Sequence, residues 1–297
     1  MSDSHVIETH DLSKRYGRLE AVRALNLRVP AQQITGFLGR NGAGKSTTIK
    51  MLLGMTHPSA GGGAVLGKRI DDPRENREMR RQVAYVAEDK QLYAYMTVAE
   101  MVRFTRSFYP DWRPEAEQRL LRQYDLPPQR KVKALSKGMR TKLALLLALA
   151  RRPQLLILDE PSEGLDPVAV EELLQALVAA AGDGTTIFFS SHQIAEVERI
   201  ADHVSILDHG RLVVDLSLDQ LRQDYRRITL GFASEKPPIF DLPGIESVQT
   251  SGRQVTLLAS CNADAVVEHA RAFHPVSVEV EPVTLREVFL ETVKEEA

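Results

Sequence analysis

Cysteine is almost missing from this chain of 297 residues, and its scarcity restricts the chemistry of the protein. Cys261 is the only cysteine, so no internal disulfide can form, and the composition suits a reducing compartment. A lone cysteine is most often a small core residue, and we assign Cys261 no chemistry. A fold held together by disulfides is therefore excluded.

A strong net charge and a long apolar run are also missing. The 38 Lys and Arg residues and 40 Asp and Glu residues leave a formal net charge of -2, so no basic field indicates a nucleic-acid partner. The first residues lack the apolar core of a signal peptide. The longest apolar stretch, residues 143–150, is far shorter than the roughly 20 residues that span a bilayer. We expect a globular chain that does not itself cross a membrane.

A glycine-rich stretch at residues 39–47 organises the rest of the chain. Its sequence, GRNGAGKST, fits the phosphate-binding pattern G-x-x-x-x-G-K-[ST]. An apolar run at 34–38 reads as a buried strand and 47–55 has the rhythm of a helix, so the loop's N–H groups and the helix dipole favour a polyphosphate. An ordinary glycine turn before a helix is the alternative. The predicted ATP-binding residues here are Gly39, Arg40, Asn41, Gly42, Ala43, Gly44, Lys45, Ser46 and Thr47.

Within this loop we assign separate roles to the lysine, the serine and two glycines. Lys45 would reach the β- and γ-phosphates, and the hydroxyl of Ser46 would bind Mg²⁺. A Cβ at Gly42 or Gly44 would intrude on the phosphates.

Upstream of the loop, residues 6–12 and 24–29 alternate apolar and polar side chains, which is typical of antiparallel strands. Residues 13–17 are expected to form a turn between them. Tyr16 in this turn is either a packing residue or a platform on which the base of ATP stacks.

Downstream, strand and helix patterns alternate. Residues 58–63 read as a glycine-rich turn, 64–67 and 82–86 as strands, and 72–81 as a helix. Helical patterns at 97–109, 115–124 and 139–151, the first opened by a Thr97–Glu100 capping box, indicate a helical insert at about 92–149. Strands at 155–158, 185–190 and 204–207 are continuous apolar runs separated by helices at 168–181 and 193–201, which predicts a parallel sheet covered on both faces.

From about residue 217 the pattern changes to strands at 228–232, 245–250, 255–259 and 276–280, with helices at 263–273 and after Thr284. The expected fold class is α/β: a P-loop NTPase core of mostly parallel sheet flanked by helices, with an N-terminal antiparallel β subdomain, a helical insert and a small C-terminal α+β appendage. We expect an ATPase domain at 1–215 and an accessory domain at 216–297.

Two acids end the apolar strand at 155–158, where ligands bind in open α/β sheets. Asp159 is suited to hold Mg²⁺, and Glu160 could polarise the water that attacks the γ-phosphate. The start of a solvated loop is the alternative.

Three further motifs accompany the phosphate loop and this strand end. LSKGM at 135–139 opens a helix, SEGLD lies at 162–166, and SSH ends a strand at 190–192. In this order the five motifs resemble those of the ATP-binding cassette (ABC) proteins, in which the last three are the signature motif, the D-loop and the switch histidine. The resemblance covers residues 1 to about 215.

The resemblance implies a head-to-tail dimer in which two chains enclose two ATP molecules. Ser136, Lys137 and Gly138 would face the γ-phosphate held by the partner subunit, at a helix N-terminus. Asp166 would lie at the subunit boundary. His192 would contact the γ-phosphate and hold the attacking water with Glu160, although a histidine after a strand is by itself more often structural.

Two departures from the family pattern bear on hydrolysis rate and metal preference. The usual signature is Leu-Ser-Gly-Gly-Gln, but Lys137 and Met139 replace its second glycine and its glutamine. Lys137 either adds positive charge near the partner's ATP or faces solvent. Glu88 stands where the family usually has a glutamine that contacts Mg²⁺, so it is either a charged metal ligand or a solvated surface acid.

The function implied is the ATP-binding and ATP-hydrolysing subunit of an ABC transporter, peripheral on the cytoplasmic face of the cell membrane. It would use ATP and Mg²⁺, pair with a second copy of itself or a homologous cassette, and energise a separate permease. The apolar segment 92–96, which contains two tyrosines, either receives that permease or packs inside the insert. The Glu88 loop and the appendage ending in EPVT at 281–284 resemble exporters.

Two other classes of function remain. One is a soluble ABC ATPase acting on ribosomes or DNA, but the single phosphate loop, the lack of sustained heptads and the mild acidity argue against it. The other is a sensor that binds ATP without turnover, which would require Glu160 to be idle.

Overall fold

The computed structural model describes residues 5–234, 238, 240 and 242–293, and it divides the chain into two compact units. The first is Met1–Asp215 and the second is Leu216–Ala297. The first unit contains two sheets and the second contains one, and each unit has its own core.

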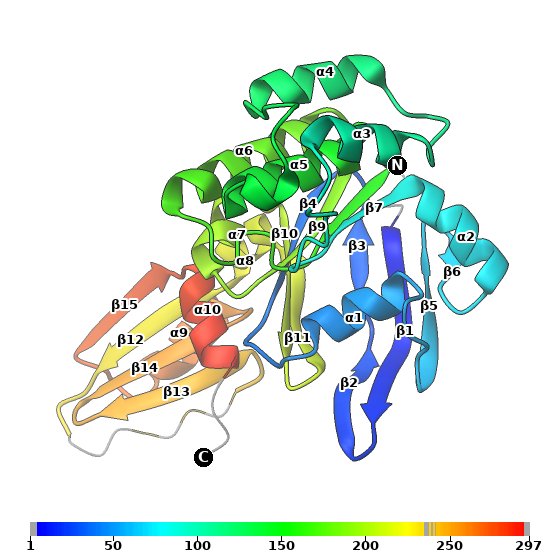
Figure 1. Ribbon diagram of the computed structural model, residues 1–297. Coiled ribbons are helices and arrows are strands. Elements are labelled where there is room, and N and C mark those ends of the chain that lie inside the picture. The colour runs from blue at the N-terminus through cyan, green and yellow to red at the C-terminus, as the bar shows by residue number, and fades with distance from the viewer. Residues whose placement is uncertain (1–4, 235–237, 239, 241, 294–297) are drawn as a thin grey trace. The chain divides into compact units, whose positions relative to one another are not determined.

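A six-stranded sheet forms the centre of the first unit (Figure 1). Its order is β11-β10-β4-β9-β8-β7, and β10, β4, β9, β8 and β7 are parallel to one another. β4, β8 and β9 are buried at every position, so their sequences are continuous apolar runs rather than alternating ones. The expected mostly parallel sheet is confirmed. Its strands are β4 (Ile34–Leu38), β7 (Val83–Val86), β8 (Leu155–Leu158), β9 (Thr186–Ser191), β10 (His203–Asp208) and β11 (Arg211–Ser217).

Helices connect these strands as the sequence pattern predicts. α1 (Lys45–Leu52) follows β4, α6 (Pro167–Gly182) leads from β8 to β9, and α7 (Ile194–Ile200) leads from β9 to β10. α2 (Pro73–Gln82) precedes β7, and Asp72 caps it by accepting hydrogen bonds from the backbone of Arg74 and Glu75. β4, β8 and β9 are parallel neighbours, so their carboxyl ends lie at the same edge of the sheet. The loops that follow these three strands contain many of the predicted site residues.

An antiparallel sheet is the second layer of the first unit. Its strands are β1 (His5–Tyr16), β2 (Leu19–Leu25), β3 (Arg28–Pro30), β5 (Ala60–Val65) and β6 (Lys68–Arg69), with β1 central. Its apolar face packs with Phe37, Met51 and Phe188 from β4, α1 and β9 in one core. The phosphate-loop helix is therefore held between the two sheets.

The predictions of two turns in this part of the chain are wrong. Residues 13–16 belong to β1, and the turn before β2 is only Gly17 and Arg18. Residues 60–63 belong to β5 rather than to a glycine-rich turn. Glycine here allows β5 to lie close to β1. A Cβ at Gly61, where φ is 69°, would lie 2.2 Å from the carbonyl oxygen of Asp11 on β1.

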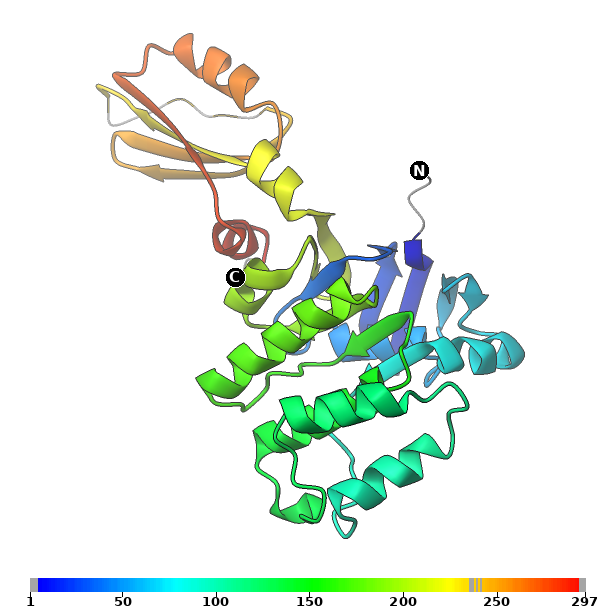
Figure 2. The same cartoon turned by 90° about the horizontal axis from the view of Figure 1, so that it is seen from above.

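The helical insert of the first unit contains α3 (Val98–Arg106), α4 (Pro114–Gln123), a 3₁₀ turn at Val132–Ala134 and α5 (Lys137–Leu149). Figures 1 and 2 show α3, α4 and α5 grouped together, in green and blue-green. The Thr97–Glu100 capping box is confirmed, since each side chain binds the other's backbone N–H. The insert ends where α5 returns the chain to β8.

The second unit is a four-stranded antiparallel sheet with order β13-β14-β12-β15. Ile228, Leu230, Val255 and Leu257 form its core with Val266 of α9. Its elements are α8 (Leu218–Asp224), β12 (Arg226–Gly231), β13 (Ile245–Ser251), β14 (Gln254–Ala259), α9 (Ala263–Arg271), β15 (Ser277–Pro282) and α10 (Leu285–Thr292).

Cys261 corrects one expectation about the second unit. It is exposed, because it lies in the short connection between β14 and α9 rather than in the core.

Candidate active site

The phosphate loop connects the end of β4 to the first residue of α1, Lys45. Gly44 caps the helix with a φ of 108°, and Gly42 has a φ of 86°, both in the region that glycine adopts most readily. A Cβ at Gly44 would lie 2.3 Å from the carbonyl oxygen of Ala21 on β2, whereas a Cβ at Gly42 would meet no protein atom within 4 Å. Gly44 is therefore required first by the antiparallel sheet behind the loop, which the sequence did not reveal.

Lys45 is buried, and its ammonium group is held within the loop. Its Nζ atom donates to the carbonyl oxygens of Gly39 at 2.6 Å and Arg40 at 3.2 Å. It also lies 3.1 Å from Oε1 of Glu160, a carboxylate oxygen that accepts no hydrogen bond. The buried cation therefore has a carboxylate as its counter-charge, and phosphate oxygens would compete for the same ammonium group.

Ser46 and Asp159 meet across the loop from α1 and the end of β8. The Ser46 hydroxyl donates to Oδ1 of Asp159 at 3.1 Å, and the same oxygen accepts a 2.7 Å hydrogen bond from Ser190. The Ser190 hydroxyl in turn accepts the backbone N–H of Glu160 at 2.9 Å. A hydroxyl and a carboxylate held this close are a donor set that suits Mg²⁺.

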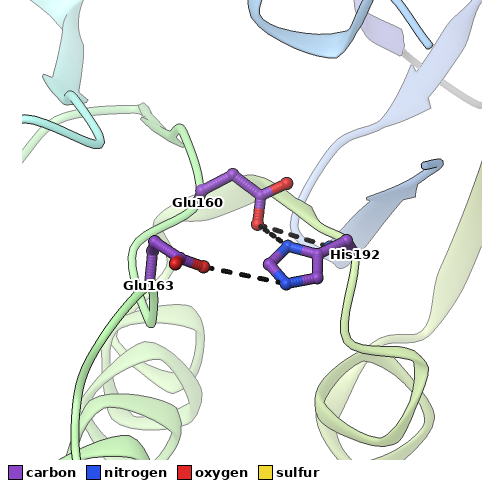
Figure 3. Close-up of side chains that lie close together, drawn as sticks. All are labelled: Glu160, Glu163 and His192. Carbon is purple, nitrogen blue, oxygen red and sulfur yellow. Dashed lines mark hydrogen bonds and ion pairs between the residues drawn. The ribbon is translucent and has the colours of Figure 1, made fainter. Parts of the chain in front are cut away.

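Glu160 and His192 face each other from the ends of β8 and β9 (Figure 3). Nδ1 of His192 lies 2.9 Å from Oε2 of Glu160, and the backbone N–H of His192 donates to the same oxygen at 3.3 Å. Glu160 has a φ of 44°, so the chain turns sharply directly after Asp159. The two predicted catalytic residues are thus in direct contact.

A second carboxylate approaches the histidine from the other side. Oε2 of Glu163 lies 3.7 Å from Nε2 of His192, and Figure 3 shows the imidazole between the two glutamates. Ligand atoms of Glu160, Glu163 and His192 all lie within 4.8 Å of one another. These three residues could also hold a cation. They are different residues from the predicted Mg²⁺ ligands, Ser46, Glu88 and Asp159.

A cavity of about 470 Å³ lies in front of these groups. Tyr16 is half exposed at its edge, with Lys14 Nζ 5.1 Å from the centre of its ring. The lining gathers most of the predicted phosphate-loop residues with Glu88 and both catalytic residues. It consists of Tyr16, Leu19, Ala21, Asn41, Gly42, Gly44, Lys45, Ser46, Thr47, Glu88, Glu160, Glu163 and His192.

The predicted signature residues do not line this cavity in the described part of the chain. Ser136 is the N-cap of α5 and accepts the backbone N–H of Met139, and Gly138 allows α5 to approach Ala169 of α6. The ammonium group of Lys137, which is exposed, lies against Gly164 of the D-loop. Asp166 is also exposed and caps α6.

Several residues that position the site were not singled out from the sequence. Ser162, on the loop after β8, and Ser191, the last residue of β9, both donate to Oε2 of Glu196 on α7. Lys90 donates to the carbonyl oxygen of Pro161 at 3.1 Å, and burial together with the charge of Lys137 lowers the pKa of Lys90. The serines lie inside recognisable motifs, whereas no motif marks Glu196 or Lys90.

A groove of about 620 Å³ runs from Ser46 and Asp159 past Glu88 to the helical insert. Near it lies an aromatic cluster of Tyr93, Tyr95, Phe104 and Phe108, with ring centres 5.0 to 5.8 Å apart. All four side chains are exposed, so the tyrosines of 92–96 do not pack inside the insert.

Known proteins resemble this chain in sequence and in fold. The family model described as ABC transporter matches residues 22–163. The bacitracin transport ATP-binding protein BcrA of Bacillus licheniformis is 36% identical over 227 residues, which cover 75% of this chain and 74% of BcrA. The ABC transporter ATP-binding protein YtrB of Bacillus subtilis is 27% identical over 286 residues, which cover 96% of this chain and 97% of YtrB.

Solved structures agree. The structure of an ATP-binding subunit of an ABC transporter matches 73% of this chain and 92% of its own chain, at 33% identity and a TM-score of 0.66. The dimeric post-hydrolysis structure of the ATP-binding cassette MJ0796 with ADP and Pi matches 71% of this chain and 98% of its own, at 21% identity and a TM-score of 0.64, which supports the fold.

This chain belongs to the ABC transporter family. It is an ATPase and the ATP-binding subunit of an ABC transporter, as the resemblance predicted. Within the described residues, no helix has both the length and the apolar character needed to span a bilayer.

Proposed function

We propose that the cavity binds ATP with Mg²⁺ and that the first unit, 1–215, is the ATPase domain. The observation that carries the proposal is the meeting of Lys45, the Ser46–Asp159 pair and the Glu160–His192 pair at the carboxyl edge of one parallel sheet. Lys45 and the loop N–H groups would bind the phosphates, and Tyr16 would support the base. Ser46, Asp159 and Glu88 would hold Mg²⁺, which when bound neutralises charge on the phosphates.

Hydrolysis is assigned to Glu160 and His192. ATP phosphates would draw Lys45 away from Oε1 of Glu160, leaving that carboxylate free to accept a proton from the attacking water. His192, held 2.9 Å from Oε2 of Glu160, would orient that carboxylate and contact the γ-phosphate. Burial of Glu160 and Lys45 strengthens these interactions, because little water screens them.

We further propose a head-to-tail dimer of this chain, or a pair with a homologous cassette. The exposed N-terminus of α5, with Ser136, Lys137 and Gly138, would complete the ATP site of the partner subunit. Asp166 would lie at the subunit boundary beside it. Unit 2, 216–297, is an accessory domain in this proposal.

The permease is proposed to dock on the aromatic cluster of Tyr93, Tyr95, Phe104 and Phe108. Four exposed aromatic rings in contact are an apolar surface of the kind that binds a partner helix. The adjacent groove reaches Glu88 and Asp159, so movement at this surface can be transmitted to the ATP site. The chain would thus lie on the cytoplasmic face of the membrane, held there by the permease.

Export is the direction we propose, because the relative BcrA is named for bacitracin transport and the Glu88 loop resembles those of exporters. The test is affinity purification of the tagged chain from detergent-solubilised membranes of its native host. We expect a stoichiometric polytopic partner. In a variant with Tyr93, Tyr95 and Phe108 changed to Ser, we expect that partner to be lost from the purified complex. Recovery with ribosomes or DNA-processing proteins would instead favour a soluble ABC ATPase.

A further inference from the structure

Glu196 is a half-buried acid that the ATPase roles assigned above do not use. It lies on α7, one turn after His192, and its Oε2 atom accepts hydrogen bonds from Ser162 at 2.8 Å and Ser191 at 3.0 Å. Ser162 is 6% exposed and Ser191 is fully buried. The carboxylate of Glu196 therefore accepts hydrogen bonds from two hydroxyl groups that are shielded from water.

The two serines lie close in sequence to the two residues of the catalytic pair. Ser162 lies two residues after Glu160 and Ser191 lies one residue before His192. The Ser191 hydroxyl also accepts the backbone N–H of Gln193 at 2.9 Å, which fixes the turn into α7. Oε2 of Glu196 thus joins the D-loop to the end of β9, directly before His192.

The helix that carries Glu196 is itself held firmly on the sheet. Val197 is fully buried against β4, and a Cβ at Gly36 would lie 2.3 Å from its Cγ1 atom. Because Glu196 precedes Val197, its backbone position is set by that packing. The carboxylate of Glu196 therefore has a well-defined position, and Ser162 and Ser191 both bind to it.

We propose that Glu196 is a positioning residue for ATP hydrolysis, joining Ser162 and Ser191 so that Glu160 and His192 keep their contact. The proposal rests on the catalytic roles given above to Glu160 and His192. Glu196 does not line the ATP cavity, so it should affect turnover rather than ATP binding. Misplacing a catalytic group by about 1 Å can cost on the order of a hundredfold in rate.

The test compares Glu196→Ala with Glu196→Gln in the full chain, by steady-state ATP hydrolysis and by ATP-binding calorimetry. Glu196→Ala should lower kcat by about tenfold or more, with KM and ATP affinity within about twofold of the native values. Glu196→Gln should stay within about twofold of native kcat, because its amide oxygen can still accept both hydroxyls. Glu115→Ala, which removes an exposed carboxylate from the first turn of α4, is the control and should change neither value.

Native kcat in Glu196→Ala would overturn the proposal, as would equal losses in the Ala and Gln variants. If Glu196→Ala does not fold, the double variant Ser162→Ala/Ser191→Ala replaces it and should show the same fall in kcat. Native turnover in that double variant would also overturn the proposal. Glu160→Gln is measured in parallel: native turnover there would refute the proposed catalytic role of Glu160, whatever Glu196 does.

Discussion

Individual residues in this site are held in place by oppositely charged or hydrogen-bonding neighbours before any nucleotide arrives. Lys45 contacts Glu160, Ser46 contacts Asp159, and His192 lies between Glu160 and Glu163. Buried charges are stable only when they are paired in this way. In the proposed site ATP would have to exchange these contacts for its own, so we expect the residues that hold them to affect both binding and turnover.

Lys45→Ala should abolish detectable ATP binding. The change removes the main cation of the phosphate loop, and charge-assisted hydrogen bonds of this kind contribute about 1.5–3 kcal/mol. It also leaves the buried Glu160 without its counter-charge. Calorimetry with ATP and Mg²⁺ measures the effect. Lys50→Ala, an exposed lysine in the last turn of the same helix, is the control and should bind ATP normally. Native affinity in Lys45→Ala would contradict the assigned role.

Glu196 gives a pH dependence of stability with a definite sign. Burial raises its pKa above the ordinary 4.5, so the folded state disfavours the charged carboxylate. This cost is present above the raised pKa and disappears as the pH falls below 4.5. Glu196→Gln should therefore raise the melting temperature most at pH 8, and the difference should shrink as the pH falls toward 5. A constant difference across this range would contradict the sign.

Whole elements depend on capping as well as on apolar faces. Thr97 and Glu100 cap α3, the helix that carries Phe104 of the aromatic cluster. Asp72, Ser136 and Asp166 cap α2, α5 and α6 in the same manner. In the last two cases the capping residues belong to the signature motif and the D-loop, so these motifs set helix starts in addition to any contact across a dimer.

Thr97→Ala should destabilise the first unit by about 1 kcal/mol, because the backbone N–H of Glu100 loses its acceptor at the start of α3. The melting temperature should fall by roughly 2–4 °C. Thr105→Ala is a matched control in the same helix: its hydroxyl binds the carbonyl oxygen of Met101 and caps nothing, so a smaller shift is expected. Equal shifts in thermal unfolding of the two variants would argue against the capping box.

The whole molecule consists of two compact units, each with its own core. Only the first unit contains the five motifs and the proposed site. In that unit the signature residues do not line the cavity formed by their own phosphate loop, within the described residues. In the proposed dimer another subunit would complete the site, and hydrolysis would then require that dimer.

Glu160→Gln should keep ATP binding, lose hydrolysis and accumulate as a dimer with ATP and Mg²⁺. The amide can still fill the space but cannot take the proton of the attacking water. Light scattering should give twice the chain mass of 33.1 kDa in ATP and the chain mass alone without nucleotide. The variant Glu160→Gln/Ser136→Arg, with a bulky side chain at the start of α5, should stay monomeric. Native turnover of Glu160→Gln would contradict the assignment.

The sequence alone determined the fold class and the motif order, because strand–loop–helix patterns and the phosphate loop are local properties of the chain. Its apolar runs predicted the parallel sheet, and its Thr97 and Thr284 capping boxes are both present. The extent of β1 and β5 and the exposure of Cys261 were not predicted, since they depend on strand pairing and chain connections. Only the tertiary structure brought Glu163 to His192 and Glu196 to Ser162 and Ser191. Such contacts join side chains from different loops, and no periodicity along the chain encodes them.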